Sequence, residues 1–175
     1  MGTTRSSDYG FDGYEGEAGW GADFRLTEQM LQEFLEVSKK WTTGEAGPSE
    51  ANIDLLDAVS FLPHVFWYDL KADAVWVCRF LGSEIVAVRG NDPTQLPLED
   101  PEVSVVDGYI RAFFDLVATE AEPVSSESQS VVEGREYLRT QSVGLPVFGE
   151  AGKVSGVIGA QVFYHPNGKR LGLSA

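Results

Sequence analysis

Cysteine and histidine are almost missing from this sequence. The 175 residues include one cysteine, Cys78, and two histidines, His64 and His165. A single cysteine cannot close an intrachain disulfide, and a cysteine-based zinc site cannot be assembled within one chain. We therefore expect a reducing compartment and no metal site.

Basic residues are also scarce. Thirteen lysines and arginines stand against 27 aspartates and glutamates, which gives a formal net charge of −14. A broad negative potential repels nucleic-acid phosphates and anionic bilayers, and no run of the sequence concentrates basic residues. We expect neither nucleic acid nor a membrane as a partner.

The sequence also lacks long apolar runs. No stretch approaches the roughly 20 apolar residues that a membrane-spanning helix needs. The first twenty residues lack the basic start and the apolar stretch of a secretory signal. We expect a soluble, cytoplasmic protein, in which an apolar fraction of 43% is sufficient for one folded core.

The N-terminal part divides into a leader and a helix. Residues 1–25 combine glycine with Asp, Glu and Tyr without helical or alternating period, which predicts a disordered leader. Residues 26–48 are predicted to form an amphipathic helix and a linker rich in glycine and proline. The apolar residues of this helix recur at steps of about three and four: Met30, Leu31, Phe34, Leu35, Val37 and Trp41.

Residues 49–166 are predicted to form one domain, and residues 167–175 a C-terminal tail. The domain begins with a short helix that ends before Pro63. The apolar side of this helix is expected to comprise Ile53, Leu55, Leu56 and Val59. Strands are predicted at 65–70, 75–81, 124–132, 137–148 and 154–164, and helices at 83–88 and 105–117.

This order of elements indicates an α+β fold with five antiparallel strands. Because the helices gather in the middle of the chain instead of alternating with strands, the pattern excludes a doubly wound parallel sheet. The helices are expected to cross one face of the sheet and to leave a cavity beneath them. The amphipathic helix of residues 26–48 precedes this unit.

Several short segments within these elements resemble the PAS family, over about residues 55 to 165. More specifically, they resemble a compact PAS subfamily of short stand-alone proteins in alphaproteobacteria. It rests on Leu62-Pro63-His64-Val65-Phe66-Trp67-Tyr68-Asp69, Cys78-Arg79-Phe80-Leu81-Gly82-Ser83-Glu84, Arg89-Gly90-Asn91-Asp92-Pro93-Thr94, Gly134-Arg135-Glu136-Tyr137, Leu145-Pro146-Val147 and Gly156-Val157-Ile158-Gly159.

The resemblance implies a bacterial, non-enzymatic sensory module with no particular ligand. It also implies a sharp turn at Gly82, for which we expect glycine to supply a positive φ. Modules of this family often dimerise through an N-terminal helix, which favours a homodimer. The alternative for the predicted amphipathic helix is that it folds back over its own sheet.

No cofactor is expected. Cys78-Arg79-Phe80-Leu81 looks like the core of the flavin-adduct signature of photosensory PAS domains, but here it alternates like a strand between Val77 and Gly82. Haem needs an axial ligand on the helical side, whereas both histidines are predicted at strand boundaries near the rim. Flavin and haem are therefore disfavoured, and Cys78 is interpreted as a buried thiol.

A ligand pocket is predicted where aromatic side chains of the strands and the long helix converge. Its predicted lining is Phe66, Tyr68, Trp76, Cys78, Phe80, Tyr109, Phe113, Gln141 and Gln161. The two glutamines lie within apolar strands, where a buried amide needs a hydrogen-bond partner. The competing interpretation is that the aromatics fill the core and both glutamines face water, since strand facing depends on register. Arg79 is expected on the outer face, beside acidic groups.

Three hypotheses for function remain open. The first is a sensor that binds a small, mainly apolar ligand and relays its occupancy through a dimer or partner surface. The second is a ligandless scaffold that binds another protein, with Met30, Leu31, Phe34, Leu35 and Trp41 as the dimer or partner surface in either case. The third is a small cone-fold isomerase with Asp69 as base and Tyr68 or Tyr109 as hydrogen-bond donors.

Overall fold

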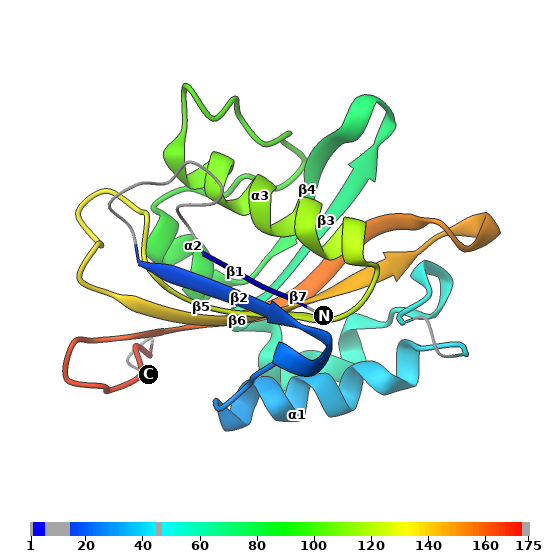
Figure 1. Cartoon of the computed structure of the whole chain (residues 1–175), viewed down its shortest axis with the longest axis horizontal. Coiled ribbons are helices and arrows are strands. Elements are labelled where there is room, and N and C mark those ends of the chain that lie inside the picture. Colours follow the sequence, from blue (N-terminus) through cyan, green and yellow to red (C-terminus); the bar gives the residue numbers. More distant parts are fainter. Residues whose placement is uncertain (1, 6–14, 45–46, 173–175) are drawn as a thin grey trace.

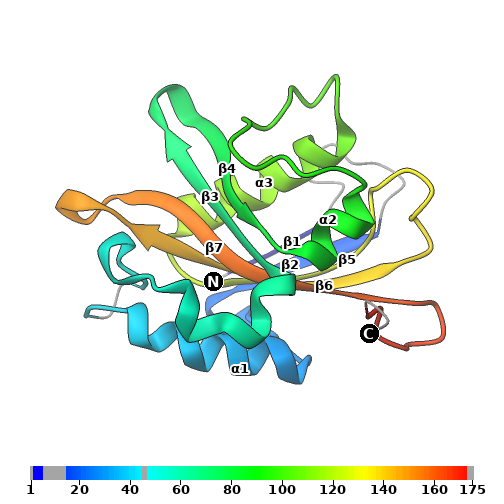
Figure 2. The ribbon, with the colours of Figure 1, turned by 180° about the vertical axis from the view of Figure 1, so that it is seen from behind.

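The computed structural model describes residues 2–5, 15–44 and 47–172, which form an antiparallel sheet between two layers of helices (Figures 1 and 2). The strands are β1 (Gly2–Arg5), β2 (Gly16–Trp20), β3 (Val65–Lys71), β4 (Val75–Leu81), β5 (Val124–Gln129), β6 (Arg139–Phe148) and β7 (Val154–Tyr164). Their order across the sheet is β1-β2-β5-β6-β7-β3-β4. The α+β class is thereby confirmed, and the arrangement is consistent with a PAS-like fold. The sheet has seven strands instead of five.

Two helices cover one face of the sheet, called the inner face here. They are α2 (Ser83–Arg89) and α3 (Val105–Glu120), and α3 runs across the strands (Figure 1). The Ser104 hydroxyl caps α3 by accepting a hydrogen bond from the Asp107 amide at 3.1 Å. Phe114 and Val117 of α3 are buried in the core beneath it. In the described part of the chain, no helix is long and apolar enough to cross a membrane.

The opposite, outer face is covered by α1 (Gln29–Ser38) and by the 3₁₀ helix η5 (Leu55–His64) (Figure 2). Leu31, Phe34 and Trp41 have no exposed surface, and the Phe34 ring packs edge-on against Trp41 at 6.0 Å. The amphipathic helix therefore folds back over its own sheet. The prediction that these three residues form a dimer or partner surface is wrong, while Met30 and Leu35 are partly buried against the same core.

The N-terminal leader is more ordered than its composition indicated. β2 pairs with β5, with Ala18 opposite Ser126, and β1 pairs with β2. Backbone hydrogen bonding to the edge of β5 orders a segment with few apolar side chains, an effect that composition does not report. Residues 6–14 of the predicted leader lie outside the described residues. The boundary at residue 25 stays a prediction.

The predicted helix before Pro63 has a different period. η5 consists of two 3₁₀ segments joined at Ala58, whose φ of −109° is not helical. Leu55, Ala58 and Phe61, spaced by three residues, share its buried side. Leu56 and Val59, which an α-helical period places on the apolar side, are 75% and 62% exposed. That part of the prediction is wrong.

Gly82 is required for space and not for a positive φ. Its φ is −66°, which every residue tolerates. A Cβ at this position would lie 2.3 Å from the carbonyl oxygens of Leu62 and Pro63. The expectation of a left-handed turn is corrected, because close approach of the chain before β3 explains the glycine.

Two connecting segments pair with the sheet. Residues 95–98 run along β4, where the Cys78 amide donates to the Leu96 carbonyl at 3.0 Å and the Leu98 amide donates to the Trp76 carbonyl at 2.9 Å. In the predicted tail, the Leu171 amide donates to the Phe163 carbonyl at 2.7 Å. The tail is thus attached to β7 as far as it is described.

Phe34→Ala tests whether α1 belongs to this core. A buried phenylalanine replaced by alanine loses its contacts and leaves a cavity, so the free energy of unfolding is expected to fall by about 3–5 kcal/mol. Urea denaturation provides the measurement. The matched control is Val59→Ala on exposed η5, which should change stability by less than about 0.5 kcal/mol. Equal stability of the two variants would contradict the packing of α1 against the sheet.

Candidate functional site

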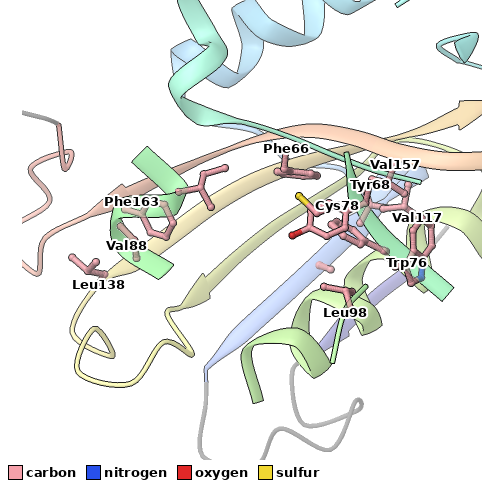
Figure 3. Close-up of a cluster of buried hydrophobic side chains, with 14 residues drawn as sticks. Phe66, Tyr68, Trp76, Cys78, Val88, Leu98, Val117, Leu138, Val157 and Phe163 are labelled. Atoms are coloured by element: carbon pink, nitrogen blue, oxygen red, sulfur yellow. The ribbon is translucent and has the colours of Figure 1, made fainter. Parts of the chain in front are cut away.

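A cavity of about 90 Å³ lies between α2, α3 and the inner face of the sheet. It is lined by Phe66, Tyr68, Leu81, Ile85, Val88, Arg89, Val106, Tyr109, Ile110, Phe113, Phe114, Ser126, Ser128, Gln129, Ser130, Val131, Val132, Thr140, Ser142, Gln161 and Phe163. This volume holds several water molecules. Figure 3 shows the buried cluster of the inner core, in which Phe66, Tyr68, Val88 and Phe163 also line the cavity.

The helical side of the cavity is apolar. Ile110, Phe113 and Phe114 project from α3, and Ile85 and Val88 from α2, because their helical spacing places them on the sheet side. Phe114 contacts a cluster of aromatic rings and lies 4.7 Å from the ring centroid of Tyr68. These five side chains offer a ligand only apolar contacts, whereas Arg89 of α2 and Tyr109 of α3 bring polar groups from the same side.

The sheet side carries a row of polar side chains. Ser126 of β5 is opposite Ser142 of β6, which is opposite Gln161 of β7. We call these three residues the polar row. No side-chain hydrogen bond to the described residues is found for any of them, and all three line the cavity. A ligand can therefore meet unpaired donors and acceptors on this side.

Ser128 of β5 and Thr140 of β6, the next cross-strand pair, are already hydrogen-bonded to each other. The hydroxyls of Ser128 and Thr140 lie 2.7 Å apart, and Thr140 also donates to the Ser128 carbonyl at 3.2 Å. Tyr109 approaches Ser128 from α3. Burial raises the pKa of the Tyr109 hydroxyl, and the hydrogen bond with Ser128 partly opposes this rise. These groups hold α3 to the sheet at one end of the cavity.

Arg89 brings a charge to the cavity. Its Nη2 is 2.5 Å from Oδ1 of Asp107, and its Nε donates to Asn91 Oδ1 at 2.8 Å. Asp107 Oδ2 accepts a hydrogen bond from the Glu99 amide at 2.8 Å. The remaining nitrogen, Nη1 of Arg89, is buried without a hydrogen-bond partner among the described residues. The ion pair joins the end of α2 to the start of α3.

Tyr68 places a second unpaired group in the cavity. The residue is 1% exposed, and no nitrogen or oxygen of the described chain pairs with its hydroxyl. Its hydroxyl faces the thiol of Cys78 (Figure 3), and thiol sulfur is a weak acceptor. Burial raises the pKa of Tyr68, and burial likewise raises the pKa of Cys78. Both groups are neutral at physiological pH.

Five of the nine residues predicted for the pocket line it: Phe66, Tyr68, Tyr109, Phe113 and Gln161. Trp76 and Cys78 face the same side but lie in the core beyond the cavity wall. The Trp76 indole donates to Asp115 of α3 at 2.7 Å. They support the site without touching it.

Phe80 is on the outer face, which corrects its assignment. Trp67 pairs with Phe80 and Tyr68 pairs with Cys78, so the register shifts by one residue between these two pairs. A β-bulge of this kind moves the following side chains to the other face. Phe80 therefore packs with the outer core.

Gln141 is also on the outer face, where it holds the start of α1. Its Oε1 accepts hydrogen bonds from the amides of Thr27 at 3.1 Å and Glu28 at 2.7 Å. Its Nε2 donates to the Thr27 hydroxyl at 2.9 Å. This glutamine has partners within the protein, which neither interpretation from the sequence anticipated.

The candidate catalytic residues for an isomerase do not meet. Asp69 is on the outer face, where Arg79 lies 3.0 Å and Lys71 lies 2.9 Å from its carboxylate. The Arg79 guanidinium also lies 4.3 Å from the centre of the Trp67 ring, so its expected place on the outer face is confirmed. Asp69 and Tyr68 are thus separated by the sheet, and the predicted base cannot act in the cavity.

The histidines differ in their surroundings. Burial lowers the pKa of His64, which is half-buried and whose Nδ1 has no hydrogen-bond partner in the described chain. His165 stacks on Tyr137 at 6.5 Å. Both histidines lie at strand boundaries, as predicted, because His64 directly precedes β3 and His165 directly follows β7.

Sequence reasoning missed Ser126 and Ser142 of the polar row, and it missed Arg89. Ser126, Ser128 and Ser130 alternate along one strand, which was a readable sign of a polar inner face. Arg89 gave no such sign, because its ion pair with Asp107 joins two helices separated by the linker.

Gln141 and Gln161 provide a direct test of the assignment of side chains to the outer and inner faces of the sheet. Gln141→Ala should lower the free energy of unfolding by about 1–3 kcal/mol, since it removes the acceptor of the Thr27 and Glu28 amides just before α1. Gln161→Ala is the matched control and should change it by less than about 1 kcal/mol, because its amide bonds to no described residue. Chemical denaturation of both variants gives the comparison. A larger loss for Gln161→Ala would reverse the assignment of the two faces.

Comparisons with known proteins give one distant structural similarity. No protein-family model matches the sequence, and no curated protein matches it. A solved structure described as that of an RNA-binding light-oxygen-voltage receptor aligns with a TM-score of 0.45 and 15% sequence identity. The alignment covers 69% of this chain and 36% of the other, so the chain spans about a third of that receptor's length.

Proposed function

We propose that this chain is a PAS-type sensory module that binds a small, mainly apolar ligand between α3 and the sheet. The observation that carries the proposal is the cavity itself, with an apolar wall facing unpaired polar groups. The Tyr68 hydroxyl is buried there without a nitrogen or oxygen partner in the described chain. The polar row lines the same cavity without a side-chain hydrogen bond to the described residues. Leaving such groups unpaired is unfavourable, and a ligand that pairs with them removes this penalty.

The proposed relay passes through β6. Thr140 and Ser142 line the cavity, and Gln141 between them holds the start of α1 on the outer face. A shift of β6 on ligand binding therefore reaches α1 directly. Occupancy would change the outer surface seen by a second copy or a signalling partner, provided that the ligand binds one arrangement more tightly than the other.

No flavin or haem is proposed for this cavity. Cys78 is on β4, fully buried, and is not among the described residues that line the cavity. The histidines do not line the cavity.

A ligandless scaffold is the second candidate. Small-molecule pockets usually measure about 300–1,000 Å³, whereas this cavity is about 90 Å³. The small volume favours a packed core in which the polar row is solvated by water. Leu56 and Val59, exposed on η5, would then belong to the partner surface.

Native mass spectrometry of the purified chain separates the two candidates. We expect a reproducible mass above that of the denatured chain, released when the protein unfolds, and a solution without visible absorbance. The sensor proposal fails if the native mass equals the denatured mass and a metabolite panel produces no thermal shift.

Phe113→Trp tests the cavity by filling it. If the space is used by a ligand, the co-purified mass should be lost while stability changes by less than about 1 kcal/mol. If the core is solid, overpacking should instead lower stability by about 1–3 kcal/mol without any ligand effect. Tyr137→Trp, at a residue that is 47% exposed, is the control and should change neither property.

A further inference from the structure

Among the described residues that line the cavity, only one is charged. That residue is Arg89, although the chain carries 27 acidic residues. The acidic groups are thus kept away from the place where a ligand would bind. This selects against a cationic ligand, because a buried cation needs a nearby carboxylate.

The positive charge of Arg89 is already neutralised by an ion pair with Asp107. Arg89 forms its ion pair with Asp107, whose side chain is 2% exposed, and both Asp107 oxygens are engaged. A ligand carboxylate would add a negative charge to a neutral buried pair, with Asp107 close by. Burial of an unbalanced charge is strongly unfavourable. An anionic ligand is therefore disfavoured as well.

Two hydrogen-bond donors nevertheless remain unpaired. Arg89 Nη1 can only donate, and the Tyr68 hydroxyl donates to nothing better than the Cys78 sulfur. Both residues line the cavity. Together they require an acceptor atom that carries no full charge.

We infer that the ligand is an uncharged compound with an apolar body and a carbonyl-type oxygen that accepts hydrogen bonds from Tyr68 and Arg89. This inference rests on the proposed sensory function. Ketones, amides, esters and lactones have such an oxygen. Their apolar part would lie against Phe113 and Ile110, and the polar row would contact any second polar atom.

Three probes of nearly equal size separate the possibilities. Ethylbenzene has no acceptor, acetophenone has a neutral carbonyl, and benzoate has a carboxylate. Dissociation constants for the full chain are measured by NMR titration at one pH and one salt concentration. We expect acetophenone to bind about tenfold more tightly than either of the others, which corresponds to the gain of one or two neutral hydrogen bonds.

Tyr68→Phe tests the donor itself. Because the hydroxyl has no good partner in the protein, this variant should be at least as stable as the parent while it loses about tenfold of its affinity for acetophenone. Its affinity for ethylbenzene should not change. Tyr137→Phe, which removes an exposed hydroxyl bonded to Arg135, is the matched control and should leave all three affinities unchanged.

The outcomes distinguish this inference from the proposed function. Equal binding of the three probes would support an apolar cavity and overturn the carbonyl assignment. Tightest binding of benzoate would overturn it in favour of a carboxylate. If no probe binds, the inference also fails, and the mass measurement described above decides the proposed function separately. Unchanged acetophenone affinity in Tyr68→Phe would remove the assigned donor.

Discussion

The structure depends on a sheet that is buried on both faces. Every residue of β6 from Thr140 to Val147 is buried, so each successive side chain must find packing partners on alternate sides. α3 supplies the partners on the inner face and α1 on the outer face. Removing either helix would expose a row of apolar side chains, which ties the N-terminal segment to the rest of the fold.

The same constraint explains where the cavity is. Space beneath α3 exists because small residues occupy the inner face of the central strands, where Gly144 and Gly159 sit beside Ser142. A Cβ at Gly159 would lie 2.4 Å from the Phe66 ring, and one at Gly144 would lie 2.9 Å from the Phe113 ring. Both aromatic rings therefore rest directly on glycine backbone. The cavity is the space left next to these contacts.

The elements could be predicted from the sequence, but several side-chain directions could not. Alternation correctly placed Phe66 and Tyr68 on one face, and it failed at Phe80 because a bulge shifts the register between Tyr68 and Trp67. Helical spacing likewise failed at Leu56, where the period is three instead of 3.6. A β-bulge or a 3₁₀ helix cannot be recognised from the amino-acid composition, although each changes which side chains are buried.

Hydrogen bonds to backbone groups far away in the sequence could not be predicted either. Gln141 and Gln161 look alike in the sequence, yet one holds α1 and the other faces the cavity. The ordering of β2 depends on the free edge of β5, more than one hundred residues away.

The pairing of residues 95–98 with β4 has a further consequence for self-association. Exposed strand edges are templates on which copies of a protein can stack into fibrils. On the β4 side, the amide and carbonyl of Cys78 and the carbonyl of Trp76 are already taken by the chain's own linker. Strand addition at this part of β4 would therefore require the linker to detach first.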